Sequence, residues 1–331
     1  MEKEFDIYGL GSALMDILVR VEDEVLSNLN LKKGEMTLVN REQCGVIEKE
    51  ISSHDSKRVP GGSTANAIVV AQQLGCRNVF CNVVGHDLNG RMYKEAMEKH
   101  GIVANLVLSD NLTGHAITFI TPDAQRSFAV HLGAALDLDR AHINADDIKK
   151  CKILHTEGYL IGEPGGLRDA ALFALSVAKK NDVLVSLDLS DPNIVRNNLR
   201  DLREIVSKYV DILFANEDEA REFTGFDDGR ALEEMSKICR IAVLKLGDKG
   251  SIVNISGQIH RIEPFPAEVV DTTGAGDTYA AAVLYGVVKD VAVERAAKLG
   301  SYLAAKVVSQ IGARLDTIDM KEVNRILEYD N

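Results

Sequence analysis

The residues best suited to chemistry lie in one short stretch, 269–277, which reads Val-Val-Asp-Thr-Thr-Gly-Ala-Gly-Asp. Gly274, Ala275 and Gly276 carry almost no side chain, so their N–H groups can converge on one point at the start of a helix. Such a point attracts anions, and a phosphoryl group fits it. Asp277 then places a carboxylate where a base that activates a hydroxyl would stand, although Asp is also a favoured helix cap. The stretch predicts either a phosphoryl-transfer site or a capped turn.

Flanking elements must hold this stretch in place. Ahead of it, Ile262 and Phe265 belong to a Pro-interrupted run that predicts an extended chain. Behind it, apolar residues recur at helical spacing and predict a helix opened by Asp277: Ala280, Ala281, Leu284, Val287 and Val288. A strand, a Gly-rich turn and a helix are therefore expected to meet here.

The second half of the chain alternates strands and helices at the spacing typical of a parallel sheet covered by helices. The predicted strands are 153–156, 184–187, 212–214 and 242–246. Ligands in such sheets bind beyond the carboxyl ends of the strands. The residues just past those ends are Glu157, Asp188, Asn216 and Gly247, and we expect them near a binding site.

The first half of the chain is organised differently. A buried strand at 5–11 contains Gly9-x-Gly11, but Leu14 and the lack of a following helix leave a dinucleotide-binding fingerprint incomplete. Strands predicted at 17–21 and 35–39 are not wrapped by helices and indicate an insertion, and two more strands are predicted at 115–121 and 127–132. Asp16, which precedes the first of them, is by residue type alone typical of a solvated loop carboxylate.

A helix is predicted to begin in Pro60-Gly-Gly-Ser-Thr-Ala-Asn66 and to end at Gly75. Gly61 and Gly62 would let the backbone approach a ligand, and Asn66 would present an amide from the first turn. A plain glycine turn before a helix explains the same residues equally well.

Composition excludes several classes of protein. The chain has 331 residues, 46% hydrophobic and 27% charged, with a net charge of -12, which argues against nucleic acid or an anionic membrane surface as partner. It contains no apolar run near the ~20 residues of a membrane span, and its acidic N-terminus is unlike a signal peptide, so a cytoplasmic protein is expected. The five cysteines contain no Cys-x-x-Cys pair and are predicted to be reduced core thiols. The eight histidines show no metal-binding spacing and are predicted to be structural or on the surface.

The string Asp271-Thr-Thr-Gly-Ala-Gly-Asp277 resembles the C-terminal signature of the PfkB (ribokinase-like) kinases, most closely the adenosine kinase branch. The resemblance implies a ribokinase-like α/β fold, with a mostly parallel central sheet flanked by helices on both faces and a small β lid. It implies one domain, 1–331, with the lid formed by approximately 16–40 and 113–133. In that family the final Asp is the base, here Asp277, and the three residues before it form the anion hole.

Further residues receive roles from the resemblance. Substrate binding is implied for Ser12, Asp16, Gly61, Gly62 and Asn66, with Met36 and Leu160 at positions where related enzymes hold a purine. ATP binding is implied for Asn216, Lys245, Gly247 and Ser301, and indirect Mg²⁺ binding for Asn216 and Glu219, although acidic residues there also suit a helix dipole. A monovalent cation such as K⁺ is implied at Asp271, Thr273 and Gly312.

The leading hypothesis is an ATP-dependent phosphotransferase that uses Mg²⁺ and phosphorylates a primary hydroxyl of an adenosine-like nucleoside. One alternative is a sugar kinase acting on ribose, fructose or 2-keto-3-deoxygluconate. A non-catalytic small-molecule binder and an NAD-binding oxidoreductase are the other two. The expected partners are small molecules, and the expected assembly is a monomer or a lid-mediated homodimer.

Overall fold

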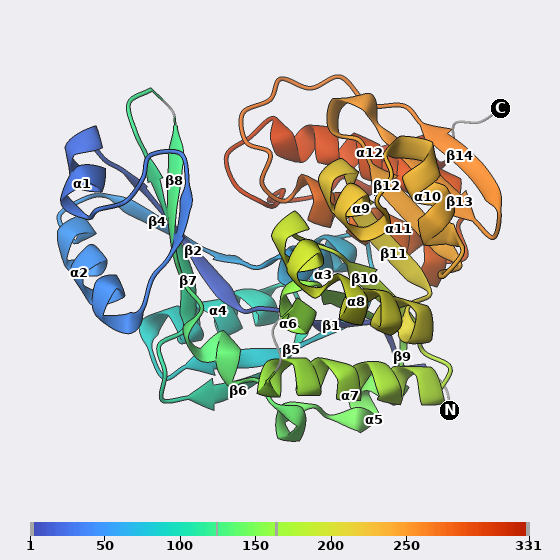
Figure 1. Ribbon diagram of the computed structural model, residues 1–331, viewed down its shortest axis with the longest axis horizontal. Coiled ribbons are helices and arrows are strands. Elements are labelled where there is room, and N and C mark those ends of the chain that lie inside the picture. The colour runs from blue at the N-terminus through green and yellow to red at the C-terminus, as the bar shows by residue number, and fades with distance from the viewer. Residues whose placement is uncertain (1–2, 124, 163–164, 329–331) are drawn as a thin grey trace.

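The computed structural model describes residues 3–123, 125–162 and 165–328 and divides into a large α/β body and a smaller β lid (Figure 1). In the described chain the sheet of the body has nine strands, in the spatial order β14-β13-β12-β11-β10-β9-β1-β5-β6. These strands are β1 (Phe5–Leu10), β5 (Asn78–Gly85), β6 (Val103–Ser109), β9 (Cys151–Glu157), β10 (Leu184–Asp188), β11 (Ile212–Asn216), β12 (Ile241–Lys245), β13 (Ser251–Ile255) and β14 (Gln258–Ile262). Neighbours are parallel from β6 to β12, and β13 and β14 are antiparallel. The predicted fold class, mostly parallel α/β, is confirmed.

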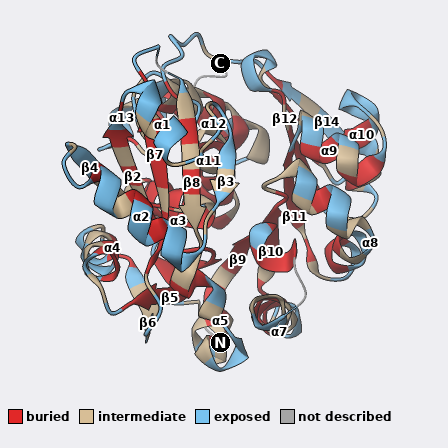
Figure 2. Cartoon of the chain, turned by 60° about the vertical axis from the view of Figure 1, so that its left-hand side comes forward, coloured by how far each residue is buried: buried red, intermediate tan, exposed pale blue. Residues whose placement is uncertain are grey.

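Helices cover both faces of this sheet and bury it between two hydrophobic cores. One core includes side chains of α3 (Ser63–Gln73), α4 (Leu88–Lys99), α11 (Ala275–Val288), α12 (Val293–Val308) and α13 (Met320–Glu328). The other includes side chains of α5 (Ala145–Lys149), α6 (Tyr159–Gly162), α7 (Gly166–Lys180), α8 (Pro192–Tyr209), α9 (Glu217–Thr224) and α10 (Asp228–Ser236). Short 3₁₀ helices are η1 (Gly133–Asp137), η2 (Arg140–His142) and η3 (Gly247–Lys249). Central strands such as β5 are buried along their whole length, as Figure 2 shows for the sheet interior, because helices pack on both faces.

The lid is a separate sheet with the order β3-β8-β7-β2-β4. Its strands are β2 (Leu14–Arg20), β3 (Met36–Leu38), β4 (Ser56–Gly61), β7 (Gly114–Ile120) and β8 (Arg126–His131). Two helices, α1 (Asp23–Asn28) and α2 (Arg41–Ile51), lie on its outer side, at the left of Figure 1. Along β2 the buried residues are Met15, Ile17 and Val19, so these face the helices, whereas Asp16 and Leu18 face the other way.

Several elements differ from the predictions. Asp16 lies inside β2 and pairs with Val59 of β4 and Ala116 of β7, so it is not a loop residue. Residues 263–269 contain no regular strand, because β14 ends at Ile262, so a loop and not a strand leads into the 269–277 stretch. The helix behind that stretch begins at Ala275 and not at Asp277. Within the described residues no helix combines the length and the apolar character needed to cross a membrane.

Candidate active site

Asp277 lies in the first turn of α11 and faces α3. Its Oδ1 accepts a hydrogen bond from Ser63 Oγ at 2.7 Å, and its Oδ2 accepts one from Asn66 Nδ2 at 2.8 Å. The N-cap of α11 is Gly274, so Asp277 is the third helical residue and the capping alternative does not describe it. Burial raises the pKa of Asp277 to about 6, against the two hydrogen bonds, which lower it. The carboxylate is therefore ionised at neutral pH and more basic than an ordinary Asp.

Gly274 allows the turn before α11 to form. Its φ is +77°, and a Cβ there would lie 2.1 Å from the carbonyl oxygen of Ala313. Only glycine fits this combination of a left-handed conformation and a close backbone contact. The turn brings the start of α11, including Ala275 and Gly276, against the segment that follows α12.

Asp16 approaches from the lid. A Cβ on Gly61 would lie 2.2 Å from Asp16 Oδ2, so the glycine makes room for the carboxylate. Burial raises the pKa of Asp16 to about 6, the charge of Arg314 opposes this rise, and the charge of Asp277 adds to it. Asp16, Asn66 and Asp277 are far apart in the sequence. In the fold they form one group of interacting polar side chains, because Asp16 and Asp277 interact by charge and Asn66 donates to Asp277.

Arg314 is the residue of this group that the sequence analysis missed. Its Nε donates to Asn66 Oδ1 at 2.6 Å, and its positive charge acts on both Asp16 and Asp277. Its Nη2 is buried and has no hydrogen-bond partner within the described structure. Arg314 lies in the irregular segment after α12 and belongs to none of the motifs, so only the folded chain reveals its position.

Glu157 joins the segment before β2 to the first turn of α3. This buried carboxylate, at the end of β9, accepts from Ser12 N at 2.8 Å and from Thr64 N at 2.9 Å. Ser12 precedes β2, and Thr64 is in the first turn of α3. The sequence marked Glu157 as a candidate because it lies at the end of a parallel strand. In the structure it positions two segments by accepting hydrogen bonds from their backbone N–H groups.

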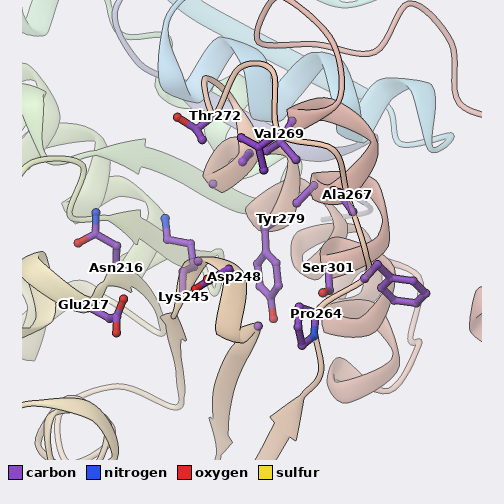
Figure 3. A pocket seen from close by; sticks show the side chains of 18 of the residues that line it. Asn216, Glu217, Lys245, Asp248, Pro264, Ala267, Val269, Thr272, Tyr279 and Ser301 are labelled. Carbon is purple, nitrogen blue, oxygen red and sulfur yellow. The ribbon is translucent and has the colours of Figure 1, made fainter. Parts of the chain in front are cut away.

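A cavity of about 770 Å³ lies on the other side of the α11 N-terminus (Figure 3). The predicted ATP-binding residues Asn216, Lys245, Gly247 and Ser301 all line it, together with Ala275 and Gly276 of the predicted anion hole. Gly274 is not among its lining residues, although it sets the turn. In Figure 3, Asn216 and Lys245 stand on one wall and Tyr279 and Ser301 on the other.

Lys245 places a cation beside the predicted anion hole. Its Nζ is 2.7 Å from Asp188 Oδ2 and would be 3.1 Å from a Cβ on Gly276. Burial alone would lower the pKa of Lys245, but the nearby carboxylates of Asp188 and Glu219 raise it above its ordinary value. The ammonium therefore stays charged next to the start of α11.

Asn216 and Glu219 bind each other. Both Glu219 oxygens accept hydrogen bonds from Asn216, from its backbone N at 2.9 Å and from Nδ2 at 2.8 Å, and Glu219 N donates to Asn216 Oδ1. Glu219 is buried and does not line the cavity, whereas Asn216 does. Burial, with Asp188 adding to it, raises the pKa of Glu219 to about 7. Any effect of Glu219 on a bound cation would pass through Asn216 or water.

Asp271 already has a cationic partner. Arg126 Nη1 of β8 lies 2.5 Å from Asp271 Oδ1, which also accepts from Thr273 N and Oγ1, while Oδ2 accepts from Gly312 N. Burial would raise the pKa of Asp271, but these partners hold it below its ordinary value. The carboxylate is surrounded by donors, so it does not fit as a ligand of K⁺ in this arrangement.

The two positions aligned with purine contacts lie apart from this group. Met36 is on the edge strand β3 of the lid, with 57% of its surface exposed. Leu160, in α6, has no exposed surface and packs in the core that contains α5 to α10. Because none of its surface is exposed, Leu160 does not line the surface open to a ligand in this conformation.

Comparison with known proteins decides the family. Residues 36–320 match the model of the pfkB family carbohydrate kinases. The chain belongs to this family. Among solved structures, it is similar to adenosine kinase from Sinorhizobium meliloti, with a TM-score of 0.86, 30% identity and coverage of 97% of this chain and 99% of that one. A probable sugar kinase from Rhizobium etli is similar too, with a TM-score of 0.87, 28% identity and coverage of 98% and 99%. A 5-dehydro-2-deoxygluconokinase from Clostridium botulinum is 28% identical over 82% of this chain and 85% of the relative.

The family resemblance inferred from the motif is thus confirmed, and the protein is a kinase with a ribokinase-like fold. The glycines that suggested an oxidoreductase have a packing role in this kinase. A Cβ on Gly9 would lie 2.5 Å from Ile68 Cγ1, and one on Gly11 would lie 2.3 Å from Thr64 Cβ. They let α3 pack closely against the end of β1, which positions Asn66.

Proposed function

We propose that this kinase transfers the terminal phosphoryl group of ATP to a primary hydroxyl of an adenosine-like nucleoside, with Asp277 as the base. The observation that carries the proposal is the position of Asp277 between two different environments. On one side lie Ala275, Gly276 and Lys245, which line the cavity, and on the other lie Asn66 and the residues around it.

The charged and polar groups that line the cavity suit the phosphates of ATP and a bound Mg²⁺ ion. The phosphates would lie against the start of α11, where backbone N–H groups and the helix dipole favour an anion and Lys245 adds a charge. Mg²⁺ prefers oxygen ligands and keeps several waters, which suits a wall that carries Asn216, Glu217, Asp218 and Asp248. When bound, the ion would neutralise charge that develops on the phosphates.

The residues of the chain then have separate tasks. Asp277 accepts the proton of the attacking hydroxyl, and Asn66, which now donates to Asp277, can turn that hydrogen bond to the incoming substrate. Asp16 and Asn66 hold further hydroxyls, and Gly61 and Gly62 let the substrate approach the backbone. The anion hole and Lys245 stabilise the phosphoryl group during transfer.

A sugar or sugar-acid acceptor is the second candidate, and Arg314 favours it. The unpartnered Nη2 of Arg314 lies in the group formed by Asp16, Asn66 and Asp277 and offers a donor to an acceptor oxygen. The positions of Met36 and Leu160 also provide no aromatic sandwich for a purine. A carboxylate-bearing acceptor, as the name of the Clostridium botulinum relative denotes, would satisfy that donor.

A panel of acceptors tests the proposal. The purified chain is assayed with MgATP and adenosine, 2′,3′-dideoxyadenosine, ribose, fructose, 2-keto-3-deoxygluconate and 5-dehydro-2-deoxygluconate, and product phosphorylation is measured directly. The proposal expects the highest kcat/KM with adenosine and a large loss with the dideoxy analogue. Highest activity with either sugar acid would instead support the second candidate.

An Arg314→Gln variant sharpens the choice. If Arg314 binds a carboxylate, the change should raise KM for a sugar acid by at least about tenfold while affecting adenosine less, since a charged hydrogen bond is worth roughly 1.5–3 kcal/mol. An equal loss with both acceptors would show that Arg314 only orders Asn66.

A further inference from the structure

A cluster of Cys44, Glu48 and His115 lies in the lid, on the side of the sheet that faces α2 and opposite to the side that Asp16 faces. One ligand-type atom from each, Cys44 Sγ, a Glu48 carboxylate oxygen and a ring nitrogen of His115, lies within 4.8 Å of the other two. Cys44 and Glu48 are four residues apart on α2 and so share a helix face, and His115 comes from β7. The cluster joins the outer helix of the lid to its sheet.

The orientation of His115 leaves one nitrogen available inside the cluster. Its Nδ1 is 2.9 Å from the carbonyl oxygen of Thr113, which can only accept, so Nδ1 carries the proton. Nε2 then presents its lone pair to Cys44 Sγ at 2.8 Å and lies 3.9 Å from Glu48 Oε1. A histidine whose other ring nitrogen donates to a backbone carbonyl is the arrangement found for metal ligands.

His131 repeats this arrangement on the neighbouring strand. It pairs with His115 across β7 and β8, and the ring centroids are 5.6 Å apart. Its Nδ1 lies 3.1 Å from the carbonyl oxygen of Val39, so its Nε2 is likewise left without the proton when the ring is neutral. Two imidazoles on one face of the sheet therefore lie under the same helix.

We propose that Cys44, Glu48 and His115 bind a transition-metal ion of the Zn²⁺ type, with His131 or water completing a four-coordinate site. Thiolate and imidazole ligands select Zn²⁺ over the Mg²⁺ that serves phosphoryl transfer. Tetrahedral bonds of about 2.3 Å to sulfur and about 2.0–2.1 Å to nitrogen place those atoms roughly 3.6 Å apart. Cys44 Sγ and His115 Nε2 would thus separate slightly to admit the ion, while Glu48 is already within reach.

The proton balance of binding is simple. The Cys44 thiol releases its proton to solvent as the Zn–S bond forms, and His115 binds through a lone pair it already has. The thiolate and the Glu48 carboxylate together balance the double charge of the ion. The metal ion would enter from the side of Glu48, because the side chain of Glu48 is 39% exposed whereas that of His115 is 2% exposed. Bound metal would clamp α2 onto the sheet behind Met15, the residue that pairs with His115.

Cobalt substitution tests the site on the full chain without nucleotide. After removal of metals with a chelator, Co²⁺ is titrated while the thiolate-to-cobalt charge-transfer absorption is recorded. The proposal expects one equivalent of Co²⁺ per chain, intense visible absorption typical of tetrahedral coordination, and displacement by Zn²⁺. Cys44→Ser should abolish the charge-transfer band, and the matched control Cys239→Ser should keep it.

A second variant guards against loss of folding in Cys44→Ser. Glu48→Gln changes a partly exposed residue and should weaken Co²⁺ binding by at least about tenfold while leaving the charge-transfer band at saturation. Zn²⁺ should also raise the melting temperature of the wild-type chain and not that of Cys44→Ser. Absence of stoichiometric binding, or a band that survives in Cys44→Ser, would overturn the proposal.

Discussion

At the scale of single residues, replacement of Asp277 distinguishes a catalytic role of this side chain from a purely structural one. Asp277→Asn keeps the side-chain size and leaves the start of α11 free to bind phosphate. We expect kcat to fall by about 10²–10⁴, the usual loss when a positioned base is removed, with little change in the Kd for ATP. Steady-state kinetics and direct ATP binding measure the two quantities.

The matched control for that variant is Asp169→Asn. It makes the same chemical change in the first turn of α7, where Asp169 is exposed, and should leave kcat unchanged. Near-normal kcat in Asp277→Asn would remove Asp277 from the mechanism.

The pKa of Asp277 also predicts the pH profile. Its folded pKa is raised to about 6, so the carboxylate is protonated below that pH and ionised above it. The kcat/KM should therefore rise as pH increases through about 6 and level off near neutrality. The raised pKa also means that Asp277 favours folding most below its unfolded pKa, and this contribution is lost as pH rises through about 6.

Asp16→Asn distinguishes the two neighbouring carboxylates that titrate in this range. The rising limb should remain, because Asp277 is still present, and its midpoint should move to lower pH, because a nearby negative charge is gone. A profile that becomes flat in Asp16→Asn would assign the titration to Asp16 instead.

Some of the site could be read from residues alone and some could not. The small residues before Asp277 indicated an anion site because their chemistry is local, and Glu157 and Asn216 were marked by their place after predicted strands. Arg314 and Arg126 were not found, because each acts on a carboxylate far away in the chain. The partner of a long flexible side chain is set by tertiary structure, which no local pattern records.

At the scale of elements, the Arg126–Asp271 ion pair links the lid strand β8 to the segment before α11. Arg126→Gln should loosen the lid and raise KM for the acceptor by about fivefold, the factor that about 1 kcal/mol of lost ion-pair energy implies. Initial rates at varied acceptor concentration measure this change. Arg20→Gln, an exposed arginine on the lid strand β2, is the control and should behave as wild type.

The same variant tests the monovalent cation. With Arg126 on Asp271, exchange of Na⁺ for K⁺ should change the wild-type rate little, because the carboxylate is already neutralised. Removal of the guanidinium frees Asp271, so Arg126→Gln should respond to K⁺. Strong K⁺ activation of the wild-type enzyme would show that a cation and Arg126 do not compete.

Elements were predictable where their pattern was local and strong. The run behind Asp277 indicated α11, and the alternating units after residue 150 indicated the parallel strands. The hairpin of β13 and β14 was missed, although Ser256-Gly257, with φ of +50° and +94°, is a two-residue turn that could have revealed it. β4 was missed because Ser-Lys-Arg-Val-Pro-Gly is polar and contains proline, which an edge strand tolerates.

At the scale of the whole molecule, we propose that lid and body fold as one unit. A single core cluster contains Ile17 and Ile47 of the lid together with Ile68 and Leu303 of the body. Calorimetry should therefore show one unfolding transition at all scan rates that permit refolding. A separate low-temperature transition, lost when residues of the lid core such as Ile47 are replaced by alanine, would show that the lid melts independently.

The lid has a further consequence for how new activities arise on this scaffold. It consists of two excursions from the main sheet, one between β1 and α3 and the other after β6, whereas the cavity beside the start of α11 is built from residues after position 215. A recombination event or an engineer could therefore exchange residues 12–62 and 113–132 as a cassette without changing any residue that lines this cavity. The part of acceptor binding that the lid supplies, such as Asp16, would then be inherited separately, whereas Asn66, Asp277 and Arg314 would stay with the body.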